Sequence, residues 1–303
     1  MWAHENEETA IPQRASTGGR AQGLAAMVLS SVLFSAMSLG IRLAGADSFL
    51  TSFVRFGVGV AVVGSLALAG RTRIHFVNLP LLLLRGVTGS VAVYTSFLAI
   101  EKLGIARGSV LSYTFPLFAA VGGAIFLKER VRPLRWAALT AAVGGMVLMR
   151  WGALAGEGPA AASTALWYGL VLAGSVAAGF AIVCVRRLTA TDSPPSIFMS
   201  QSLLGFWLVF VPAMSRPAAF SLRLALILLA IGLLAAVAQM LMTWAYGRVE
   251  IATGSLLSML TPVINVGVGV LAFQERFGPL EAAGAAVILA ACTAVMVPGR
   301  RGG

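Results

Sequence analysis

Charged residues, cysteine and histidine are all scarce in this sequence. Asp, Glu, Lys and Arg make up 11% of its 303 residues, against about 25% in soluble domains. Only two cysteines occur, and because Cys184 and Cys292 both lie in apolar segments, neither a disulfide framework nor a zinc site is expected. The two histidines, His4 and His75, lie outside the centres of the apolar segments and offer no buried proton relay.

Acidic residues are also missing from the middle of every apolar segment. Of the eleven in the chain, Glu101, Glu129, Glu250 and Glu275 border such segments, and the others lie in the N-terminal stretch, in connections or near segment ends. A buried catalytic site needs a nucleophile with a base, or a metal. No such set is available at depth, so we expect neither an enzyme nor a cofactor. Exchange of a cation for a proton on a buried carboxylate is not expected either.

Apolar residues dominate the composition instead. They make up 58% of the chain, and the mean hydropathy is +0.90, which predicts an all-α polytopic membrane protein in a lipid bilayer. The net charge of +11 raises the question of nucleic acid. Because the basic residues are dispersed between apolar runs, anionic lipid and the positive-inside bias explain them more simply. No nucleic-acid partner is expected.

One motif occurs twice and reveals an internal repeat. Residues 105–116 read IARGSVLSYTFP and residues 251–262 read IATGSLLSMLTP, with seven of twelve positions identical at a spacing of 146 residues. The match continues without a gap, since Glu129 and Pro133 correspond to Glu275 and Pro279. Each copy therefore marks the same place in two successive structural units.

The apolar runs predict ten transmembrane spans, five in each unit. Their expected positions are 23–44, 48–69, 79–100, 105–126, 133–150, 164–186, 195–213, 222–246, 251–273 and 279–297. A possible signal-peptidase site, Ala44-Gly45-Ala46, follows the first run, but that run is long for a signal peptide and Arg42 precedes the site, so a retained span is favoured. The predicted domains are a disordered cytoplasmic tail at 1–22, repeats at 23–150 and 164–297, and a second tail at 298–303.

The distribution of Lys and Arg predicts the orientation. With a cytoplasmic N-terminus, thirteen basic residues fall on the cytoplasmic side and seven on the other, so both termini are expected inside. Five spans per unit is an odd number, and the second unit must therefore enter the membrane from the opposite side. Such inverted repeats are typical of secondary transporters, which bind their substrates near the bilayer midplane.

Several motifs resemble the EamA-type exporters of the drug/metabolite transporter superfamily. These are Ser52-Phe53-Val54-Arg55-Phe56, residues 94–100, the two IA-x-GS motifs and Lys128-Glu129-Arg130. The resemblance covers residues 23–297 and is strongest to bacterial exporters of amino acids and related metabolites. It implies alternating access through a central cavity in the bacterial inner membrane, with a small molecule as the substrate. The alternative is efflux of lipophilic drugs. A fused inverted repeat can complete the pathway as a monomer.

Polar and aromatic side chains on span faces are the candidates for the cavity. Ser35 and Ser38 share one face of the first span, and Gln239 and Thr243 share one of the eighth, at helical spacing. The other candidates are Tyr94, Tyr113, Trp244 and Asn265. Serine and threonine stripes also serve close helix packing, which is the favoured interpretation for the serines of the first span. For Gln239 and Asn265 a cavity is favoured, because a buried amide needs partners.

Prolines and two arginines complete the list. Pro116 and Pro262 cannot donate to the carbonyl groups four residues earlier, so we expect spans four and nine to bend there as hinges. A static kink is the alternative. Arg55 and Arg85 each lie within a turn or two of a span end. Snorkelling or a structural bond is the favoured interpretation for both, and binding of a substrate carboxylate is the alternative.

Overall fold

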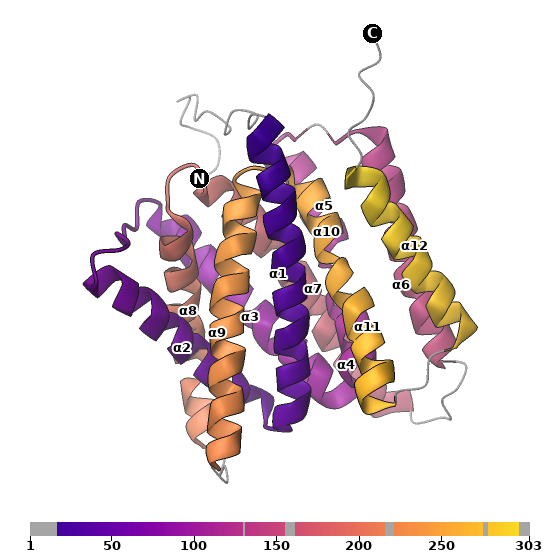
Figure 1. Cartoon of the computed structure of the whole chain (residues 1–303), viewed down its shortest axis with the longest axis horizontal. Coiled ribbons are helices and arrows are strands. Elements are labelled where there is room, and N and C mark those ends of the chain that lie inside the picture. Colours follow the sequence, from indigo (N-terminus) through magenta and orange to yellow (C-terminus); the bar gives the residue numbers. More distant parts are fainter. Residues whose placement is uncertain (1–16, 130, 155–160, 216–220, 275–277, 297–303) are drawn as a thin grey trace.

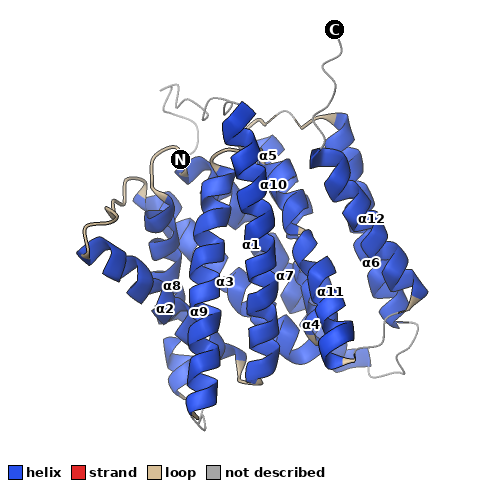
Figure 2. Ribbon diagram, in the orientation of Figure 1, coloured by secondary structure: helices blue, strands red, loops and turns tan. Residues whose placement is uncertain are grey.

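The computed structural model describes residues 17–129, 131–154, 161–215, 221–274 and 278–296, and within these ranges every regular element is an α-helix (Figure 2). The described residues form twelve helices: α1 (Thr17–Ala44), α2 (Ser48–Leu68), α3 (Leu79–Leu103), α4 (Ile105–Ser112), α5 (Phe115–Phe126), α6 (Pro133–Leu154), α7 (Ala161–Leu188), α8 (Pro194–Met214), α9 (Leu222–Tyr246), α10 (Ile251–Ser258), α11 (Leu260–Phe273) and α12 (Pro279–Met296). The expected all-α architecture is thereby confirmed. The expected C-terminal tail lies outside the described residues.

Polar residues start the helices at the predicted boundaries. Asp47 accepts a hydrogen bond from the backbone N of Phe49 at the start of α2, and Ser221 does the same for Leu224 in α9. Such side chains satisfy amide groups that have no partner within the helix. Helix α1 differs from the expectation, because it begins at Thr17 rather than at residue 23.

The order of helices repeats along the chain. Helix α2 begins at Ser48 and α8 at Pro194, 146 residues later, and α4 and α10 begin at the same spacing. Packing follows this correspondence: α1 lies against α9 as α3 lies against α7, while α2 packs on α8 and α6 on α12. Figure 1 shows α1 running along α9 and α6 along α12, with α1 beginning and α12 ending at the same end of the bundle.

Helices α2 and α8 approach closely because each presents a glycine to an aromatic ring of the other. A Cβ atom on Gly205 would lie 2.5 Å from the Phe56 ring, and one on Gly59 would lie 2.9 Å from that of Phe198. Gly59 and Gly205 occupy equivalent positions in the two repeats. Small residues that admit a neighbouring helix are the usual means of packing within a membrane.

The repeated motif forms two broken helices rather than two bent ones. Helix α4 ends at Ser112 and α5 begins at Phe115, and α10 and α11 are interrupted at Met259 in the same way. Pro116 and Pro262 lie in the first turns of α5 and α11, where the missing N–H group of proline costs nothing. The expectation of continuous spans with internal kinks is therefore corrected to helix pairs.

Seven helical stretches among the described residues are long and apolar enough to cross a membrane, one of them being α10 with α11. Phe115–Phe126 and Ala282–Ala291 are shorter apolar stretches. Many large apolar side chains point outwards, including Leu83, Trp207 and Leu271. Bilayer hydrocarbon would cover these side chains, so the chain is a multi-pass membrane protein.

Candidate functional site

A cavity of about 130 Å³ lies between the two halves of the protein. Its walls come from α1 to α5 in the first half and from α7 to α10 in the second. Both copies of the repeated motif contribute to it, through Ser109 and Ser112 in one and Ser258 in the other. Sites formed between repeats are the rule in secondary transporters.

Several polar atoms in this wall have no partner. The side-chain nitrogen of Gln239 and the hydroxyl group of Ser112 are buried and make no hydrogen bond to the described residues. Burying such groups without partners costs free energy, so both are available to hydrogen-bond a polar ligand or water in the cavity. Ser38 is less available, because its hydroxyl group donates to the backbone O of Phe34 at 2.9 Å.

Two arginines also line the cavity. Arg55 on α2 is 2% exposed and Arg85 on α3 is 3% exposed, so they do not snorkel towards the membrane surface. The other part of the expectation, a structural bond, agrees with the contact that Arg85 makes. Arg85 donates from Nη2 to Oε1 of Gln201 at 2.9 Å. Neither arginine forms an ion pair with the described residues, and Nε of both and Nη1 of Arg55 have no hydrogen-bond partner.

Of the predicted site residues, Ser38, Tyr113 and Gln239 line the cavity. Ser35 and Asn265 lie elsewhere, in a chain of hydrogen bonds in which Ser35 donates to Oδ1 of Asn265 and Nδ2 of Asn265 donates to Ser109 at 2.6 Å. This chain joins α1, α11 and α4 and gives Asn265 the partners that a buried amide needs. We therefore assign Asn265 a bridging position next to the cavity.

The remaining three candidates are not among the residues that line the cavity. Tyr94 stacks on Phe49 with ring centroids 4.4 Å apart, and the guanidinium carbon of Arg248 lies 3.5 Å from the centre of the Trp244 ring. Thr243 is fully buried, and its hydroxyl group has no partner. Their role in substrate binding stays a prediction.

Serines from neighbouring helices satisfy the backbone at the helix breaks. The hydroxyl group of Ser175 on α7 donates to the backbone O of Ser112 at 3.0 Å, the carbonyl group that Pro116 cannot use. On the opposite side Ser31 on α1 donates to the backbone O of Leu257 at 3.2 Å. Leu257 corresponds to Leu111, whose backbone O also lies 3.2 Å from the hydroxyl group of Ser175. A serine of a neighbouring helix thus contacts the last turn before each break, although the two serines do not occupy equivalent positions.

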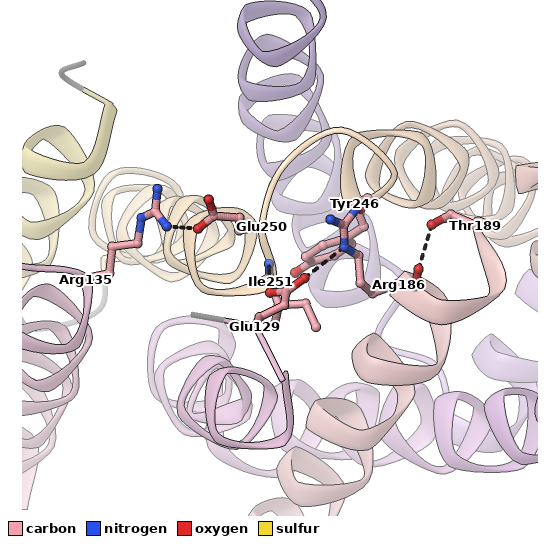
Figure 3. Close-up of polar contacts among 7 residues, drawn as sticks. All are labelled: Glu129, Arg135, Arg186, Thr189, Tyr246, Glu250 and Ile251. Atoms are coloured by element: carbon pink, nitrogen blue, oxygen red, sulfur yellow. Dashed lines mark hydrogen bonds and ion pairs between the residues drawn. The ribbon is translucent and has the colours of Figure 1, made fainter. Parts of the chain in front are cut away.

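A network of charged groups joins several helix ends (Figure 3). Nε of Arg186 donates to Oε1 of Glu129 at 3.0 Å and its Nη1 donates to the backbone O of Tyr246 at 2.6 Å. The other carboxylate oxygen of Glu129 accepts from the backbone N of Ile251, the first residue of α10, at 3.2 Å. We call Glu129, Arg186, Tyr246 and Ile251 the helix-end network. Arg135 pairs with Glu250 beside it.

The first half lacks the arginine of this network, while Tyr246 contributes only a backbone O that any residue carries. Counting back 146 residues, Arg186 corresponds to Gly40 and Tyr246 to Ile100. An equivalent arginine is therefore missing near the end of α1, and among the described residues the helix-end network joins helices at one end of the bundle.

Sequence reasoning did not single out Gln201. Its signal is present in the repeat, since Gln201 lies 146 residues after Arg55 and occupies the equivalent position on α8. For Arg55 and Arg85 the signal is the absence of acidic residues at depth, which leaves a buried cation without a neutralising partner.

Comparisons with known proteins agree with this geometry. The model of the EamA-like transporter family matches residues 21–151 and 165–297. A pseudopaline exporter of Pseudomonas aeruginosa is 28% identical over 281 residues, which are 90% of this chain and 95% of that protein. A riboflavin transporter of Rhizobium johnstonii is 30% identical over 71% of this chain and 69% of its own length. One solved crystal structure of a protein, 22% identical, covers 93% of this chain and 97% of its own with a TM-score of 0.73, so it shares the fold. The chain is therefore a membrane transporter of small metabolites, and it belongs to the EamA-like transporter family.

Proposed function

We propose that this protein is a secondary transporter that exports amino acids and related small metabolites across the bacterial inner membrane. The observation that carries the proposal is the cavity between the halves, where the side-chain nitrogen of Gln239 and the hydroxyl group of Ser112 lack partners. Its volume of about 130 Å³ is small beside the roughly 300–1,000 Å³ of pockets for drug-sized ligands. Relatives named for pseudopaline export and riboflavin transport support a small-molecule substrate.

The proposed topology has ten crossings in two inverted repeats of five, with both termini cytoplasmic. The α4–α5 and α10–α11 pairs would each make one crossing. Helix α1 packs on α9 and its equivalent α7 packs on α3, the equivalent of α9, which supports two related halves. One chain would contain the whole pathway and act as a monomer.

The proposed mechanism is alternating access, with Pro116 and Pro262 at the hinges. The helix-end network would hold one end of the bundle closed and would have to open when access alternates. Since no acidic residue is among those described in the cavity wall, the proposed mechanism does not include proton exchange on a buried carboxylate.

Efflux from proteoliposomes preloaded with a panel of labelled amino acids tests this function. We expect saturable flux that Gln239→Ala weakens by raising the half-saturating concentration. The matched control is Leu233→Ala, which alters an outward-facing side chain of the same helix. Flux that is indifferent to an imposed pH gradient would identify a facilitator. If correctly folded protein moves no amino acid but moves lipophilic drugs, the proposal is wrong.

A further inference from the structure

We propose that Arg55 and Arg85 form a carboxylate-binding cradle in the cavity, and that the exported metabolite is a small organic acid with net negative charge at neutral pH. The inference rests on the proposed function and narrows its substrate class. Both arginine residues are at least 97% buried, and both belong to the cavity wall. Each retains donors that no described residue satisfies.

Arg85 is held in place by neutral groups that leave its charge available. Its Nη2 donates to the amide oxygen of Gln201 at 2.9 Å, and its Nη1 lies over Gly89, one helical turn further along α3. A Cβ atom on Gly89 would come within 1.7 Å of Nη1, so only glycine leaves room for the guanidinium group there. An amide orients the group without neutralising it, which suits a site for a charged ligand.

Arg55 is oriented in a comparable way by aromatic rings. Its guanidinium carbon lies 5.1 Å from the centre of the Phe56 ring and 5.9 Å from that of Phe97. Cation–π contacts of this kind stabilise the position of the group and use none of its N–H donors. The planar fork of arginine therefore remains free to bind both oxygens of a carboxylate.

The charge balance of the cavity favours an anion. No aspartate or glutamate is among the described residues that line the cavity, so the two positive charges face it without a carboxylate from this part of the chain. A buried charge without a partner is costly, and each carboxylate on the ligand would offset one of them. A dicarboxylate would balance the site, a zwitterion would leave both charges in excess, and a cation would find no acidic partner.

The repeat accounts for an asymmetric site. Arg55 on α2 and Gln201 on α8 are equivalent positions, yet one carries a charge and the other an amide that orients Arg85. The first repeat would thus supply both cations, while the second supplies the amide group that positions one of them.

Equilibrium binding of labelled succinate to the purified protein in detergent tests the cradle independently of transport. Unlabelled succinamide, which is uncharged, and glutamine, a zwitterion without net charge, serve as the amide counterparts of succinate and glutamate. We expect the acids to compete at least about 30-fold better than the amides, since truncating one partner of a buried charge pair costs that much or more. Arg55→Gln and Arg85→Gln should each lower the affinity by at least that factor, and Arg55→Lys by less.

Two further variants separate binding from folding. Gly89→Ala keeps every charge but displaces the Arg85 guanidinium group, and we expect it to weaken succinate binding at least about 10-fold. Arg187→Gln removes an exposed arginine of α7 and should bind succinate as the wild type does. The cradle is refuted if amides bind as well as acids, or if the cavity variants retain wild-type affinity.

Efflux from liposomes distinguishes failure of the cradle from failure of the proposed function. Arginine-dependent succinate binding without export of any amino or organic acid would support the cradle and overturn the exporter. Export of glutamine as fast as glutamate, unchanged in Arg55→Gln, would overturn the cradle and leave the exporter intact.

Discussion

Replacing Arg186 by Gln removes the cation at the centre of the helix-end network. Its two hydrogen bonds, to Glu129 and to the backbone of Tyr246, are 3.0 and 2.6 Å long, and the Arg186 and Glu129 side chains are each 9% exposed. The variant would leave the Glu129 carboxylate buried, with the backbone N of Ile251 as its remaining hydrogen-bond donor among the described residues. Removing one partner of a buried ion pair costs about 3–5 kcal/mol.

A free-energy difference of about 1.4 kcal/mol changes an equilibrium constant tenfold. This cost therefore lowers the population of the state that contains the network, relative to states that lack it, by roughly two to four orders of magnitude. We therefore expect a lower thermal midpoint in detergent and a changed efflux rate in liposomes. The double variant Glu129→Gln/Arg186→Gln should recover at least half of the lost stability, because two amides replace the pair without leaving a buried charge.

Thermal unfolding of the four proteins in this double-mutant cycle measures the coupling directly. The neighbouring exposed residue gives the control, since Arg187→Gln should stay within about 0.5 kcal/mol of the wild type. Single variants that unfold like the wild type, or a double variant whose loss is the sum of the single losses, would refute the reasoning.

Three further predictions concern the helix breaks and their supports. Pro116→Ala and Pro262→Ala should slow efflux at unchanged expression, because a helix continued through the break resists bending; unchanged transport in both would count against the hinges. Asn265→Leu should lower the thermal midpoint through two lost hydrogen bonds between α1, α11 and α4. The substrate concentration that half-saturates efflux should stay near that of the wild type. A large rise in that concentration would instead place Asn265 in direct contact with substrate. Ser175→Ala should cost about 1 kcal/mol of stability by leaving the backbone O of Ser112 without its hydroxyl donor, and a variant as stable as the wild type would show that water replaces it.

The helices were the most predictable part of the structure. Long apolar runs and the 146-residue repeat located α2, α8 and the other long helices to within a few residues, because a membrane segment must satisfy its own backbone and be long enough to cross. The breaks after Ser112 and Ser258 were less predictable. Proline indicated that the helices are irregular there. The hydroxyl groups of other helices that contact these carbonyl groups could not be identified from the sequence.

The cavity was predicted only in part. Helical periodicity placed Gln239 on a polar face of its helix, and Gln239 lines the cavity, whereas Trp244 and Asn265, expected there as a mid-span aromatic residue and a buried amide, are not among the lining residues. Periodicity fixes the direction of a side chain about its own helix axis and not the depth or identity of the neighbouring helix. Arg55 lies only about 10 Å along its helix from the first residue of α2, so its burial depended on the packing of α2 against the rest of the bundle.

The most direct test of an alternating cavity uses a single thiol at Ser38, a residue of the cavity wall that is 4% exposed. In a Cys184→Ala/Cys292→Ala background that retains efflux, Ser38→Cys is treated with a membrane-impermeant maleimide from either side of oriented vesicles. Alternating access predicts that Ser38→Cys is labelled from both sides, and that a transported acid slows the labelling from both. Labelling from neither side, or labelling that substrate never slows, would contradict it.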